Sequence, residues 1–183
     1  MLITATQGTW LVGHASEHHI LYAYQLDNAQ NVFISMQQVE SPYYQPVPEA
    51  PAPWTPNATW HDPTFAGCNL ANGTAGDPKC YMQWAQRILG AQTNTINVYG
   101  SAFWVFFNNY SGNCGASDGG QCQLSATSLE GLSSGDHVTL YNQNVHSTDN
   151  LVIVGGSGGQ TGATFNQDPG SWGAVLAAYL AFE

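Results

Sequence analysis

The chain has 183 residues, of which only 8% are charged, and two basic side chains against twelve acidic ones give a formal net charge of −10 at pH 7. Nucleic acids and anionic membranes are bound through clustered lysine and arginine, so this balance argues against both as partners. The length supports one domain with a real core, and a hydrophobic content of 43% argues against a disordered chain.

Strand-like segments follow one another along the chain, with little helical periodicity. Alternating or short apolar runs predict strands at 20–26, 32–36, 96–102, 138–140 and 151–154. Within the second of these, Val32, Ile34 and Met36 are predicted to face the same way. Residues 80–89 fit either a short helix or a strand. An all-β fold follows, and the periodicity fits a parallel β-helix as well as an antiparallel sandwich.

Residues 41–66 differ from the rest of the chain because they contain seven prolines. Proline at this density is incompatible with the interior of a sheet, so the segment is predicted to be an extended surface loop. Its aromatic side chains include Trp54 and Trp60, for which covering the domain is the favoured role. Tyr43 and Tyr44 are equally suited to covering the domain and to stacking on sugar rings.

Four cysteines fall into two local pairs, Cys68 with Cys80 and Cys114 with Cys122. Four cysteines allow three connectivities, and the sequence does not choose between them. The short intervening loops, rich in glycine, asparagine and aspartate, favour local pairing. Disulfides of this kind are typical of an oxidising compartment.

Three glycosylation sequons begin at Asn57, Asn72 and Asn109, and with the paired cysteines they predict a secreted glycoprotein. The first residues lack the basic start and long apolar core of a signal peptide, and no apolar run approaches the ~20 residues of a membrane span. We therefore expect the chain to be a processed or truncated piece of a longer protein.

Two glutamates, Glu17 and Glu40, lie 23 residues apart, with two strand-like stretches and a turn between them. This is about the length of one coil of a β-solenoid. Stacked coils lie about 4.8 Å apart, so this spacing can bring both carboxylates to neighbouring positions on one face. Cleavage of a glycosidic bond requires such a pair, and a separation near 5 Å would suit retention whereas about 6.5–9.5 Å would suit inversion.

Zinc chemistry is an alternative, because His14, Glu17 and His18 spell the H-x-x-E-H pattern of some zinc peptidases. That motif needs a helix, on which the two histidines share a face. The flanking segments have strand character, so we expect neither a metal nor another cofactor.

Several separate motifs in the same order resemble fungal glucan 1,3-β-glucosidases of glycoside hydrolase family 55. They lie at residues 8–18, 21–26, 28–32, 39–46, 51–53, 98–100 and 106–111. The resemblance implies a right-handed parallel β-helix of the pectin-lyase-like kind over 1–183. It further implies that this is the second of two β-helical domains, with an active site in the cleft shared with an N-terminal domain.

The resemblance also implies inverting hydrolysis of β-1,3-glucan without a metal. Glu40 would be the general acid, and Glu17 would help to hold the attacking water. Residues beside this pair are assigned to substrate binding, namely His18, Tyr43, Tyr44 and Gln45. Glu40 could instead cap the proline-rich loop, Glu17 could bind backbone in a turn, and the chain could be a non-catalytic carbohydrate-binding or structural solenoid.

Overall fold

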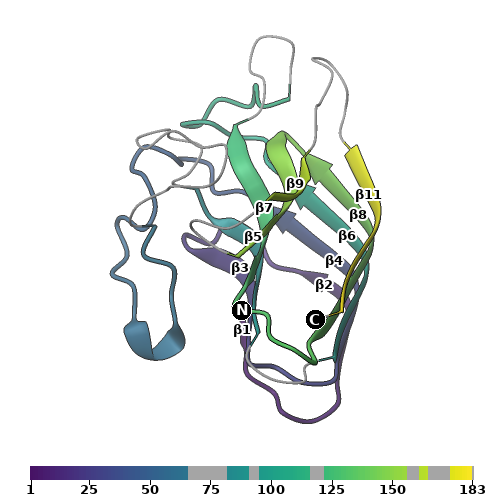
Figure 1. Cartoon of the computed structure of the whole chain (residues 1–183). Helices are drawn as coiled ribbons and strands as arrows, with labels where there is room; N and C mark the ends of the chain where they lie inside the picture. Colours follow the sequence, from purple (N-terminus) through teal and green to yellow (C-terminus); the bar gives the residue numbers. More distant parts are fainter. Residues whose placement is uncertain (66–81, 91–94, 116–121, 156–160, 165–173, 183) are drawn as a thin grey trace.

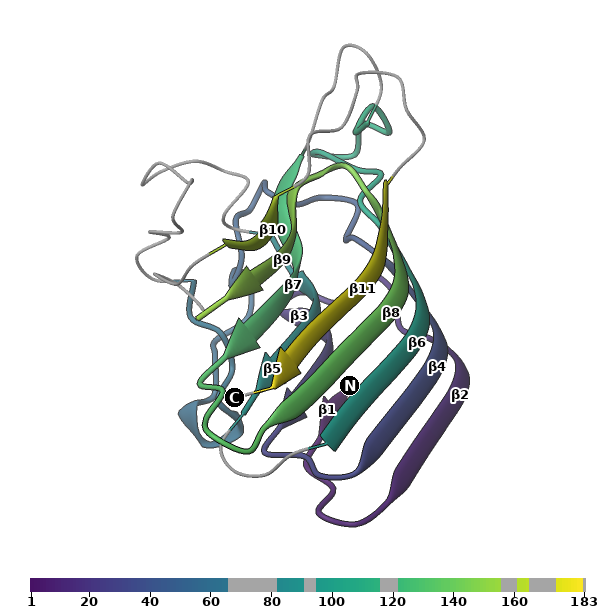
Figure 2. The same cartoon turned by 45° about the vertical axis from the view of Figure 1, so that its right-hand side comes forward.

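A computed structural model of the chain describes residues 1–65, 82–90, 95–115, 122–155, 161–164 and 174–182. Two β-sheets face each other across a common interior, as Figures 1 and 2 show from two sides. Successive strands alternate between the sheets from β1 to β9, and the strand orders are β1-β3-β5-β7-β9-β10 and β11-β8-β6-β4-β2. Within the described residues the one helical element is the short 3-10 helix η1 (Ala58–Trp60). No described helix has the length and apolar character needed to cross a membrane.

The first sheet contains β1 (Leu2–Ile3), β3 (Tyr22–Asp27), β5 (Trp84–Leu89), β7 (Gln123–Glu130), β9 (Thr148–Val154) and β10 (Thr161–Thr164). The second contains β2 (Thr9–Ala15), β4 (Val32–Glu40), β6 (Thr95–Trp104), β8 (His137–His146) and β11 (Ala174–Phe182). Neighbours pair in parallel, except that β10 on β9 and β11 on β8 are antiparallel. The all-β prediction is confirmed, the arrangement is β-helix-like, and the ambiguous stretch 80–89 supplies the strand β5.

The coils differ in length because the loops between them differ. Thr9 of β2 pairs with Val32 of β4, 23 residues further on, which is the spacing of Glu17 and Glu40. Val32 pairs in turn with Ile96 of β6. This second spacing along the chain is longer, because the proline-rich segment and the residues after it lie between the two strands. Figure 1 shows this segment leaving the sheets as a long excursion, and it contains no strand among its described residues. Its first part is nevertheless buried, including Ser41, Pro42, Gln45 and Pro46.

A left-handed residue stands at the same level in four parallel strands of the second sheet. The residues are Gly13, Met36, Gly100 and Asn142, with φ values of 69°, 56°, 75° and 51°, and the pairing of their neighbours places them side by side. Such a residue adds a bend and shifts the alternation of side chains by one position.

The shift is visible in β4. Val32 and Ile34 are buried before the bend, whereas Gln37 and Val39 are buried after it. Glu40 therefore lies on the outer face, although strict alternation from Val32 would place it in the core. The prediction that Met36 faces with Val32 and Ile34 is wrong, because Met36 occupies the bend and is 69% exposed.

The interior between the sheets is one apolar cluster with a polar layer at the level of the bends. Tyr24, Leu26, Ile34, Phe103 and Leu140 are among its fully buried side chains. In the polar layer, the Gln37 amide donates to Gln86 and to Ser101 Oγ, and the Gln143 amide donates to Thr127 Oγ1 at 2.8 Å. These bonds satisfy one end of each amide, and the opposite ends, Gln37 Oε1, Gln86 Nε2 and Gln143 Oε1, are buried without a hydrogen-bond partner.

Of the four left-handed residues at the bend, Met36 is the one that is neither glycine nor asparagine. Such a residue at positive φ is strained by about 1–3 kcal/mol. We expect Met36→Asn to raise the free energy of unfolding by about 1 kcal/mol. Met36→Val should lower it by a similar amount, because a β-branched residue tolerates this conformation least. Urea unfolding of the two variants checks this, and equal effects would show that the bend is not conformationally demanding.

Candidate functional site

Glu17, His18 and Glu40 come together at the end of β2 and β4. The parallel pairing continues beyond β2, since the Ser16 amide donates to the Gln38 carbonyl and the His18 amide to the Glu40 carbonyl, both at 3.0 Å. Glu17 consequently lies beside Glu40 on the neighbouring coil. His18 Nε2 lies 3.9 Å from Glu17 Oε2 and 3.7 Å from Glu40 Oε2.

The three side chains form a compact group that solvent reaches. One nitrogen or oxygen from each lies within 4.8 Å of the others. The side chains of Glu17, His18 and Glu40 are 38%, 27% and 27% exposed. This is the single group of three metal-capable side chains among the described residues, and it does not include His14, which lies in strand β2. The H-x-x-E-H pattern therefore does not form the helical zinc site that its spelling suggests.

The His18 ring is fixed in orientation by two contacts. Its Nδ1 lies 2.9 Å from the Ser41 carbonyl, and the ring stacks on Tyr43 with centroids 4.2 Å apart. A ring that donates from Nδ1 to this carbonyl turns Nε2 towards the two carboxylates. His18 also has a φ of 59°, so the backbone turns sharply at this point.

Glu40 is held through its backbone. Its carbonyl accepts from the Gln83 amide side chain at 2.9 Å as well as from the His18 backbone amide, which ties it to the residue before β5 of the first sheet and to the segment after β2. Two carboxylates on adjacent coils of a rigid wall can supply one proton donor and one group that orients water.

The residues after Glu40 divide between exposed and supporting roles. Tyr43 is 45% exposed and packs between His18 and Phe107, whose centroid lies 4.6 Å from that of Tyr43. Burial raises the pKa of the Tyr44 hydroxyl. Gln45 is fully buried, donates to the Ile20 carbonyl and accepts from the Gln83 amide, both at 2.8 Å. Tyr43 is thus the more exposed of the two tyrosines, whereas Gln45 fixes the loop.

Two residues that the sequence did not single out continue the row of the acid pair. Trp104 pairs with Glu40, and His146 pairs with Trp104. Glu40, Trp104 and His146 therefore stand at one level on β4, β6 and β8, and Glu17, just after β2, continues the row. His146 is buried with Nδ1 3.0 Å from the Val105 carbonyl, and desolvation lowers its pKa. Matching the bend positions would have predicted this row, but the unequal loops conceal the repeat.

The described part of the chain includes some of the predicted disulfide and glycosylation residues. Cys114 and Cys122 form the predicted disulfide, with Cα atoms 5.6 Å apart. Cys68, Cys80 and Asn72 lie outside the described residues. Of the remaining sequon residues, Asn109 is exposed, and the Asn57 side chain caps η1 by accepting from the Thr59 amide at 2.9 Å.

Comparison with known proteins finds relatives but no matching family model. The chain is 35% identical over 86% of its length to a probable glucan endo-1,3-beta-glucosidase of Arthroderma benhamiae, and 32% identical over 68% to a glucan 1,3-beta-glucosidase of Cochliobolus carbonum. It is also 40% identical over 50% of its length to the non-secreted LysM effector LysM15 of Penicillium expansum. The chain spans 16%, 15% and 6%, respectively, of these relatives' lengths.

Proposed function

Because the chain is related to fungal glucan 1,3-β-glucosidases, we propose that it is part of a glycoside hydrolase that cleaves β-1,3-glucan. The observation that carries this proposal is the exposed pair Glu17 and Glu40, which lie on adjacent coils with carboxylate oxygens within 4.8 Å. A glucan is neutral and rich in hydroxyl groups, so it suits a chain in which only 8% of the residues are charged. In the proposed reaction Glu40 protonates the glycosidic oxygen, and Glu17 orients the water that attacks the anomeric carbon.

The architecture that we propose for this enzyme is a right-handed, pectin-lyase-like solenoid joined to an N-terminal β-helical domain. Crossovers between parallel strands of one sheet are right-handed in roughly 98% of cases, which supports that hand for the β2 to β4 connection. The small share of each glucosidase relative that the chain spans, 15% and 16%, supports further domains. The Cys114–Cys122 disulfide and the sequons support a secreted glycoprotein.

Replacing the acid should remove hydrolysis and leave binding intact. In the parent enzyme, Glu40→Gln should lower the rate of glucose or oligosaccharide release from laminarin by about 10²–10⁴-fold, the contribution of a positioned general acid. Binding of laminarin measured by calorimetry should change little, because glutamine keeps the size of the side chain. The matched control is Glu49→Gln, which makes the same change at an exposed glutamate of the proline-rich segment and should leave the rate unchanged. Near-normal turnover by Glu40→Gln would exclude Glu40 as the acid.

Stereochemistry is the second test. We propose inversion on the basis of the family resemblance, but the carboxylate oxygens lie nearer than the roughly 6.5–9.5 Å that leaves room for a water between the acids. Glu17, the more exposed of the two, must therefore swing away from Glu40 when a sugar binds. NMR of the first product should show the α-anomer from the β-linked substrate. Initial release of the β-anomer would instead assign Glu17 as a nucleophile in a retaining reaction.

The isolated chain should be inactive, because it supplies one wall of a cleft and catalytic groups need support from both sides. Laminarin incubated with the 183-residue chain is expected to release no glucose above the level of Glu40→Gln. Robust turnover would refute dependence on a partner domain. The similarity to a protein named as an effector favours a second candidate, a non-catalytic glucan-binding solenoid. That candidate predicts inactivity of the complete protein too.

A further inference from the structure

We propose that a pocket next to the acid pair is a glucosyl-binding subsite, in which Trp54 and Trp60 pack against sugar rings. This inference rests on the proposed function, since it names where the glucan chain continues. The pocket has a volume of about 410 Å³ and lies between the start of β3 and the proline-rich segment. Its lining includes His18, His19, Tyr22, Trp54, Trp60 and Asp62.

The pocket combines apolar and polar side chains, which suits the apolar ring face and the polar ring edge of a hexose. Trp54 and Trp60 are 53% and 50% exposed, which leaves indole surface open to the pocket. The C–H face of a pyranose packs on such a surface, and its hydroxyl groups project from the ring edge towards polar partners. Asp62 and Tyr22 supply those partners, and the Tyr22 hydroxyl already donates to Asp62 Oδ1 at 3.0 Å.

Continuity with the acid pair identifies the occupant as the glucan. His18 lines the pocket and also lies 3.7 Å from Glu40 and 3.9 Å from Glu17. A glucan whose linkage lies at the two carboxylates can therefore pass over His18 and place a neighbouring unit in the pocket that the two tryptophans line. Among the residues that the structure describes, the pocket lining includes no lysine or arginine, which suits a neutral ligand.

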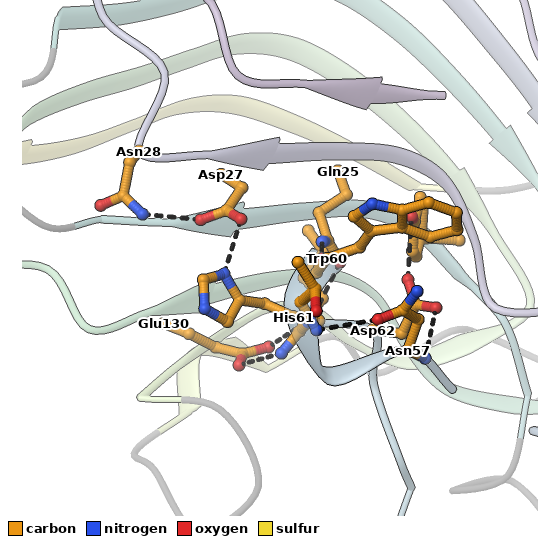
Figure 3. A network of polar contacts seen from close by, with 11 residues as sticks. Gln25, Asp27, Asn28, Asn57, Trp60, His61, Asp62 and Glu130 are labelled. Carbon is orange, nitrogen blue, oxygen red and sulfur yellow. Dashed lines mark hydrogen bonds and ion pairs between the residues drawn. The ribbon is translucent and has the colours of Figure 1, made fainter. Parts of the chain in front are cut away.

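The backbone that carries Trp60 is fixed before any ligand arrives, as Figure 3 shows. The Gln25 amide donates to the Trp60 carbonyl at 2.7 Å, and Asp62 accepts from the Asn57 amide at 2.9 Å. On the next residue, the His61 ring nitrogen lies 2.6 Å from Asp27 Oδ2. A surface that is already ordered loses less entropy on binding, so these contacts favour a binding site over a mobile cover.

Binding of laminarihexaose to the full 183-residue chain, measured by titration calorimetry, tests the subsite. Trp60→Ala and Trp54→Ala should each weaken binding by about tenfold or more, the loss that follows truncation of an interface tryptophan. Trp60→Phe should retain most of the affinity because it keeps an aromatic face. The control is Trp10→Ala: Trp10 is 72% exposed on β2 and lies outside the pocket, so its removal should leave affinity unchanged.

Two results would overturn the subsite: no binding by the wild-type chain, or wild-type affinity in both tryptophan-to-alanine variants. Near-UV circular dichroism establishes that each variant is folded. The Trp54→Ala variant is a test independent of Trp60, because the Trp54 backbone amide bonds to the nearby Pro51 carbonyl and takes no part in the contacts that hold the Trp60 backbone. Glu40→Gln separates this inference from the hydrolase. If binding depends on Trp60 but the protein does not hydrolyse glucan, the subsite is supported and the hydrolase proposal is rejected. If hydrolysis occurs but does not depend on Trp60, the hydrolase proposal is supported and the subsite is rejected.

Discussion

The ladder of left-handed residues through Gly13, Met36, Gly100 and Asn142 determines which side chains the second sheet presents to solvent. Each strand has two segments of opposite parity, and the bend joins them. Before the bend the even-numbered residues of β4 fill the core, and after it the odd-numbered ones do. Glu40 reaches the surface for this reason, as does Trp104 beside it. Because all four strands bend together, the parallel pairing survives and the row of outer side chains stays aligned.

One buried cation, Arg87, forms several of the contacts that connect the strands of this charge-poor chain. Arg87 of β5 is 9% exposed and bonds to both carboxylate oxygens of Glu130 on β7, at 2.6 and 2.7 Å. It also donates to the Gln25 side chain on β3 at 2.8 Å and to the His61 carbonyl. A planar, bidentate donor thus joins three strands to the proline-rich segment. The Gln25 side chain, which Arg87 contacts, also donates to the Trp60 carbonyl. The Arg87–Glu130 ion pair that connects the strands is therefore linked to the backbone of the pocket.

The sequence predicted the acid pair because nothing is inserted between Glu17 and Glu40: the coil has its minimal length, and spacing translates directly into adjacency. The alignment with Trp104 and His146 escaped prediction because loops of different lengths separate these strands. Met36 was predicted to face the same way as Val32 and Ile34 because an apolar residue in an alternating run carries no sign of positive φ, unlike the glycines and the asparagine at the same level. Gln45 illustrates a related limit, since a polar side chain beside a reactive group can serve the backbone as well as a ligand.

The β-helix-like arrangement explains how this chain brings three titratable side chains together on one surface. Strand pairing fixes the spacing of Glu17 and Glu40 along the stack, and the Tyr43–His18 contact fixes the third titratable group between them. These groups nevertheless lie on a surface that remains 27–38% exposed, where water competes for every polar interaction with a sugar. Hydrogen bonds and charges act more strongly where water is excluded, so acid catalysis of glycoside cleavage gains from a second wall. We therefore propose that the tryptophan pocket can bind a glucan chain by itself, whereas the acid pair needs a covering surface before it can cleave one.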